Sequence, residues 1–131
     1  MNIMANQQHL ELLMQGRADT WNTWRRSHPD ILPELHGAEL SGADLHNYNL
    51  STANLREANL YNANLSSSDL IEANLNGANL ANADLSGADL TEANLMAANL
   101  RGANLNWARL TDALISLEQL STVKSRREEM F

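Results

Sequence analysis

The chain has 131 residues, 44% hydrophobic and only 5% aromatic, and its 16 acidic and nine basic residues give a net charge of −7. This length fits one domain, the lack of cysteine excludes disulfides and thiolate metal sites, and the acidity argues against a nucleic-acid-binding surface. No apolar run reaches the roughly 20 residues of a membrane-spanning helix, and no secretory signal is visible at the start. We therefore expect a cytoplasmic protein without direct contact to nucleic acid or membrane.

Residues 1–34 have the pattern of a helical cap over one end of the domain. An apolar stripe at helical spacing is formed by Leu10, Leu13, Met14, Trp21 and Trp24. Asn6 suits the N-cap, and the helix should end before Pro29, because the residue before proline avoids helical backbone. Its charged side chains are expected in solvent: Arg17, Asp19, Arg25 and Arg26. An aromatic binding surface is the alternative role of the two tryptophans.

A five-residue repeat occupies residues 35–115. Leucine stands at every fifth position from Leu35 to Leu110, sixteen times without a break. At the sixteen positions from Ala38 to Ala113, two residues before the leucine position, alanine occurs fourteen times, with Tyr48 and Ser68 as the exceptions. From Glu39 to Asn104, the position between holds Asn, Asp or Glu in all fourteen cases, so the repeat is Ala-(Asn/Asp)-Leu-x-x.

A period of five fits neither regular secondary structure. On an α-helix, steps of five residues rotate by about 140° each and wind the leucines around the axis. On a strand, with its side-chain period of two, the leucines would alternate between faces. A coil that turns a corner every five residues keeps all leucines inside with alanine beside them, and it closes after about twenty residues. The repeat therefore predicts an all-β solenoid of about four coils with a narrow core.

Glycine marks the corners of this coil. The slot two residues after the leucine tolerates positive φ in Gly and Asn, as a repeated corner requires. It holds five of the six glycines and three asparagines: Gly37, Gly42, Gly77, Gly87, Gly102, Asn47, Asn62 and Asn82. Proline is absent from the repeat, so no backbone donor is lost between coils.

The repeat resembles the consensus of the pentapeptide-repeat family over residues 39–113. The resemblance implies a right-handed quadrilateral β-helix, and it implies no activity, because most members have none assigned. The segment Trp21-Asn22-Thr23-Trp24-Arg25, followed by Pro29, looks like the leader found on many cyanobacterial members.

Residues 116–131 are expected to form a short helix and a tail. Ser116 and Gln119 have the spacing of a capping box, and a short apolar side follows. That side consists of Leu117, Leu120 and Val123.

Trp107 is the only aromatic residue in a corner slot, and we expect the C-terminal helix to pack on it. The tail from Lys124 onward is expected to fray, with Met130 and Phe131 either free or in contact with a partner. The protein is then a monomer, or a weak dimer through a terminal helix.

No catalytic or metal-binding pattern is present. The four histidines lack the spacing of a metal site, and no nucleophile motif or phosphate-binding loop occurs. Acid pairs on an exposed β-face lack the apolar pocket that separates catalytic pKa values. We therefore expect no cofactor, no metal and no enzyme activity. The histidines are His9, His28, His36 and His46.

Positions twenty apart stack on one face, about 4.8 Å per coil. One such face carries much of the charge imbalance, and Arg109 interrupts it. On a second face Asn54, Asn74 and Asn94 stack in a way that suits amide ladders. The acidic face is the candidate interaction surface, with Asp69, Glu72, Asp89, Glu92 and Asp112.

Two functions remain open for this face. Solvated charge keeps an edge-rich solenoid soluble, which fits a non-catalytic scaffold or protein-interaction module with an unidentified protein partner. The family resemblance implies the alternative, because some members mimic DNA and inhibit DNA gyrase. Those members are longer and dimerise, whereas about four coils give a rod of only about 20 Å, half to two-thirds of a B-DNA turn.

Overall fold

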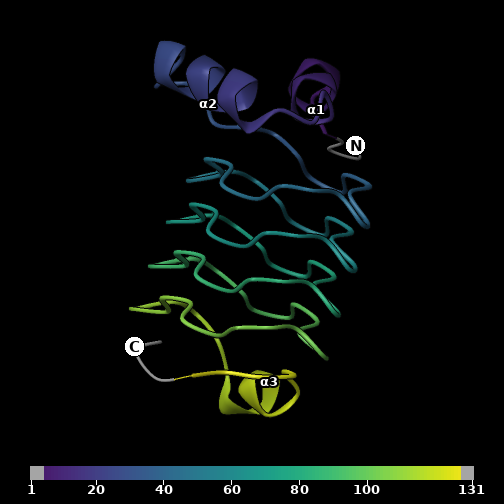
Figure 1. Cartoon of the computed structure of the whole chain (residues 1–131), viewed down its shortest axis with the longest axis vertical. Coiled ribbons are helices and arrows are strands. Elements are labelled where there is room, and N and C mark those ends of the chain that lie inside the picture. Colours follow the sequence, from purple (N-terminus) through teal and green to yellow (C-terminus); the bar gives the residue numbers. More distant parts are fainter. Residues whose placement is uncertain (1–4, 128–131) are drawn as a thin grey trace.

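The computed structural model describes residues 5–127 and consists of stacked coils with helices at both ends (Figure 1). Helices α1 (Gln7–Leu13) and α2 (Ala18–Ser27) lie at the N-terminal end, and α3 (Leu117–Ser121) lies at the C-terminal end. Between them, isolated parallel β-bridges join residues twenty apart, from Glu34↔Asn54 to Asn94↔Leu114. The predicted twenty-residue coil is confirmed.

Each coil is hydrogen-bonded to the coil before it and to the coil after it. Leu55 N donates to Asn74 O at 2.8 Å, and the corner residue Glu57 donates its N–H to Asn76 O at 2.9 Å. In the opposite direction, Asn74 N donates to Ala53 O at 2.9 Å. Since this pattern recurs on every side, the backbone bonds run along the stack and leave unpaired groups only at its ends.

The sixteen leucines form the core, and none exposes more than 2% of its surface. The two exceptions in the alanine slot are buried as well. Tyr48 lies beneath the N-terminal helices, where its hydroxyl donates to Leu13 O at 3.5 Å, and the Ser68 hydroxyl donates to Leu65 O at 2.7 Å. Tyr48 therefore fills the junction between coils and helices, and Ser68 satisfies its hydroxyl locally.

The corner slot has left-handed backbone throughout the repeat. Besides glycine, eleven other residues adopt it with φ between +56° and +66°, including Thr52 and Trp107. Such a conformation costs roughly 1–2 kcal/mol in residues with a Cβ. The bonds to both neighbouring coils hold these residues in it.

The Asn/Asp slot has a local role. From Glu39 to Asn104, all fourteen side chains of this slot accept a hydrogen bond from the N–H two residues later. This is the Asx-turn, for which Asn and Asp have the right length. The amide ladder expected along Asn54, Asn74 and Asn94 is not formed: each oxygen accepts from its own turn, and the Asn54 amide donates to Glu34 Oε1.

The N-terminal segment contains two helices, where the sequence predicted one. Asn6 caps α1 as expected, with its Oδ1 accepting from Gln8 N and His9 N. The helix stops at Met14, and Gly16 follows with φ +80°, a conformation that glycine adopts without strain. This break separates α1 from α2, which ends at Ser27, before Pro29 as predicted.

Helix α2 covers one side of the first coil with side-chain hydrogen bonds. The Asn22 amide donates to Asn47 O at 3.0 Å and accepts from Asn49 N at 2.7 Å, so it replaces a backbone peptide of a missing coil. Trp21 Nε1 donates to Asn49 O at 2.7 Å. These contacts satisfy groups that would otherwise form an open β-edge.

Arg25 corrects an expectation, because its side chain is not in solvent. It is only 8% exposed, and its guanidinium donates to Asn49 O and Ser51 O at 2.9 Å each. These two carbonyls lie at the open edge of the first coil, where no preceding coil can pair with them, and they attract this cation into the interface. Arg17, Asp19 and Arg26 are exposed as predicted.

Helix α3 covers the other end. The predicted capping box between Ser116 and Gln119 is present, and Leu120 is buried at 3% exposure. The expectation that α3 packs on Trp107 is wrong. Trp107 projects from a corner and is 54% exposed, while Leu120 closes the core in its place.

The chain returns to the ladder after α3. Lys124 N donates to Ala103 O at 2.8 Å, and Leu105 N donates to Ser125 O at 2.9 Å. The pairing therefore extends past residue 115. The expectation that the tail frays from Lys124 onward is wrong for Lys124 and Ser125, because both are hydrogen-bonded to the last coil. Met130 and Phe131 lie outside the described residues.

Replacing Arg25 tests the polar contacts of α2. We expect Arg25→Met to lower the free energy of unfolding by about 1–3 kcal/mol, because the carbonyls of Asn49 and Ser51 each lose a charged hydrogen-bond donor. Arg26→Met is the matched control on the exposed side, where a change within about 0.5 kcal/mol is expected. Urea denaturation of both variants measures the difference, and equal losses would contradict the assigned role.

Candidate functional site

The predicted acidic face exists as a stacked column at one corner. Glu72, Glu92 and Asp112 are all exposed, with φ near +58°, and the bonds from Glu72 N to Thr91 O and from Glu92 N to Thr111 O tie successive coils together. Among the described residues, none of the three forms an ion pair. Like charges on neighbouring strands repel, so this column costs stability.

The other two acids of this face are committed to the fold. Asp69 Oδ1 accepts from Ile71 N, and Asp89 Oδ1 accepts from both the N–H and the hydroxyl of Thr91. The second oxygen of Asp89 lies 3.8 Å from Arg109 Nη1. The structure therefore brings the five predicted residues to one face but leaves only the corner column fully available to a ligand.

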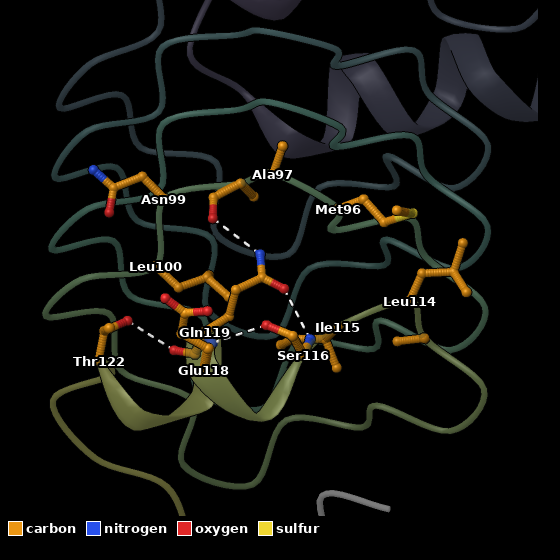
Figure 2. A pocket seen from close by; sticks show the side chains of 12 residues that line it. Met96, Ala97, Asn99, Leu100, Leu114, Ile115, Ser116, Glu118, Gln119 and Thr122 are labelled. Carbon is orange, nitrogen blue, oxygen red and sulfur yellow. Dashed lines mark hydrogen bonds between the residues drawn. The ribbon is translucent and has the colours of Figure 1, made fainter.

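The C-terminal end has a groove that the sequence reasoning missed. Its volume is about 600 Å³, and Figure 2 shows Met96 and Leu114 on one side with Asn99, Leu100 and Thr122 opposite. Gln119 lies in the middle, and its amide donates to Leu95 O at 2.7 Å and to Ala98 O at 3.0 Å. These bonds replace the next coil, which is absent because the chain enters α3 here.

Two sequence signals could have revealed this groove. Leu114 replaces the Asn or Asp of its slot, and Met96 is an apolar residue in an outward slot. Both side chains are about half exposed. The apolar wall therefore arises where the repeat loses its polar residues.

Aromatic rings gather at the N-terminal end. The rings of Trp21 and Trp24 lie 5.2 Å apart, and Trp24 lies 5.1 Å from His9 and 5.3 Å from His28. Trp21 and Leu13 are buried, whereas Leu10 and Trp24 are partly buried against the core. The two tryptophans therefore pack onto the first coil, and only Trp24 has an open side.

His9 connects α1 to the first coil. Its Nδ1 accepts a hydrogen bond from Glu34 N at 3.0 Å, which requires the neutral ring. Burial lowers the pKa of His9, and the negative charge of Glu34 opposes this shift without cancelling it.

This contact predicts acid sensitivity of the N-terminal end. Because the folded pKa of His9 lies below the unfolded value of about 6.5, its contribution is complete above that value and is lost as the pH falls through the folded pKa. We expect the stability difference between wild type and His9→Gln to shrink between pH 7.5 and 5. Denaturation at several pH values measures it, and a constant difference would contradict the contact.

Two further kinds of site, metal-ligating clusters and membrane-spanning helices, are not found among the described residues. Among residues 5–127, no group of three or more His, Cys, Asp or Glu side chains is placed to hold a metal ion. The same part of the chain contains no helix of the length and apolarity that a bilayer crossing requires.

A leucine-filled coil with an Asx-turn and a left-handed corner every five residues defines a β-helical repeat protein. The sequence matches the family described as Pentapeptide repeats in eight copies, over residues 34–70 and 73–112. The chain belongs to this family, whose solved members form right-handed quadrilateral β-helices.

Three solved pentapeptide repeat proteins are similar to the chain. One from the thylakoid lumen of Arabidopsis thaliana is 36% identical, with a TM-score of 0.54, over 57% of this chain and 56% of its own length. One from Nostoc PCC 7120 is 32% identical over 86% of this chain and 78% of that protein, with a TM-score of 0.42. One from the cyanobacterium Cyanothece 51142 is 42% identical over 67% and 64%, with a TM-score of 0.36. No curated protein matches.

Proposed function

We propose that the protein is a non-catalytic interaction module that binds a protein partner through the ends of its β-helix. One observation carries this proposal. Of the eight large hydrophobic side chains that are exposed among residues 5–127, only Tyr61 lies on the walls of the middle coils. The other seven lie at the ends: Met14, Ile31, Leu32, Met96, Trp107, Leu114 and Leu117.

Apolar residues gathered at one location indicate a contact surface, whereas scattered ones do not. The walls offer a partner much less, because the Asn and Asp oxygens that line them are occupied by Asx-turns. The general use of this family as structural or interaction modules supports a binding role. In this proposal α1, α2 and α3 cap the core and also present the contact residues.

A cross-linking experiment tests the location of the binding surface. A photoreactive amino acid is placed at Leu117 or Met14 at the ends, or at Tyr61 on the wall as the control, in cells that naturally produce the protein. We expect one cross-linked partner from an end position and none from the wall. A partner that cross-links from Tyr61 alone would overturn the proposal. The cytoplasmic location stays a prediction, which fractionation of the same cells checks.

A DNA-mimicking inhibitor is the second candidate, favoured by the unpaired column Glu72–Glu92–Asp112. A gyrase supercoiling assay separates the two candidates. We expect no inhibition at about 100 µM protein, because three charges neutralise few positive groups. Inhibition that weakens with salt and disappears in the Glu72→Gln/Glu92→Gln variant would establish the mimic in place of the interaction module.

A further inference from the structure

The two ends of the β-helix carry complementary residues on the same sides. The column of bridges that starts at Glu34 ends at Leu114. Ile31 and Leu32 lie three and two residues before Glu34 in the chain and are exposed, and Met96 and Leu114 line the groove at the last coil. One side of the stack is therefore apolar at both ends.

A second side pairs opposite charges in the same way. The column that starts at Asp44 runs through Asn64, Asp84 and Asn104 to Ser125. Asp44 is exposed at the first coil, next to the exposed Glu39. At the other end, the residues that line a hollow of about 560 Å³ include the basic Lys124, Arg126 and Arg127.

The sides of the first coil that carry Glu39 and Asp44 have open backbone edges. The other two sides are paired: helix α2 covers the side of Asn49, and Glu34 is bonded to Asn6 N and to His9. For the backbone groups of Glu39 and Asp44, no partner in the preceding direction is present among the described residues. The sides of Glu39 and Asp44 therefore present acidic side chains and an unpaired backbone edge at the N-terminal end of the stack, beside the helices.

We propose that a second copy of this chain docks head-to-tail, its N-terminal end on the C-terminal end of the first. This proposal rests on the proposed function and names the partner. In this arrangement Ile31 and Leu32 of one copy meet the groove of Met96 and Leu114 in the other, while Asp44 faces Arg126 and Arg127 at the end of its own column. Two C-terminal ends facing each other would instead place like charges opposite, which disfavours association.

A contact between two different surfaces has a distinctive consequence. Each added copy presents a new free end, so association continues into short rods instead of stopping at a dimer. The charged pairs lie at the rim of the contact, and salt weakens them. Association should therefore rise with protein concentration and fall with ionic strength.

Analytical ultracentrifugation of the full chain tests the arrangement with two variants. Ile31→Ser/Leu32→Ser removes the apolar residues of the N-terminal end, and Met96→Ser/Leu114→Ser removes those of the C-terminal end. All four side chains are exposed, so both variants should keep the wild-type circular dichroism spectrum. Tyr61→Ser on the wall is the matched control.

We expect wild type and Tyr61→Ser to form dimers and larger species at up to about 500 µM, following mass action. Each end variant alone should remain a monomer. An equimolar mixture of the two variants should form a dimer and nothing larger, because each contributes one intact end.

Three results would overturn the proposal. Wild type that stays monomeric over the whole range excludes self-association. An end variant that dimerises alone as well as wild type shows contact between two identical ends, and association lost in Tyr61→Ser places the contact on the wall. The proposed function fails separately, when a partner cross-links only from Tyr61 and not from either end.

Discussion

The hydrogen bond from a core leucine N–H to a carbonyl nineteen residues later, which the thirteen leucines from Leu35 to Leu95 make, is the interaction on which this structure depends. It aligns the coils, and it holds the left-handed corners that residues such as Thr52 and Trp107 would otherwise avoid. A coil is hydrogen-bonded along both of its edges only where another coil lies above it and another lies below it. The first and last coils lack one of the two, so the ends of the stack have to be completed by other means.

Side chains complete them by imitating the backbone. The Asn22 amide donates and accepts like a peptide group, and the Gln119 amide donates to two carbonyls at the opposite end. The Arg25 guanidinium satisfies two further carbonyls while buried. Burying this cation costs solvation, and hydrogen bonds to the carbonyl dipoles offset that cost.

The repeat could be predicted from the sequence because its signal is local and sixteenfold. Period, core and corners follow from which residue stands at each of five positions. The role of Arg25 could not be predicted from the sequence. Its partners lie 24 and 26 residues away and belong to a backbone edge that exists only after the coils have formed. The same reason applies to Trp107, because only the path of α3 decides whether Leu120 or the indole closes the core. The acidic side chains were correctly placed on one face, but their use in Asx-turns depends on backbone geometry that composition does not reveal.

The division between walls and ends explains where function is expected in such a fold. On the walls, each Asn or Asp next to a corner accepts a turn hydrogen bond with one side-chain oxygen. Asp69 and Asp89 therefore have one oxygen fewer for a ligand than their charge suggests. At the ends the repeat stops, and residues are no longer selected for the turn. Met96 and Leu114 replace polar residues there, beside a groove built where the next coil is absent. Because the ladder has to end, an irregular surface arises that a partner can recognise, and the complementarity of the two ends is the reason why we propose a second copy of the chain as that partner.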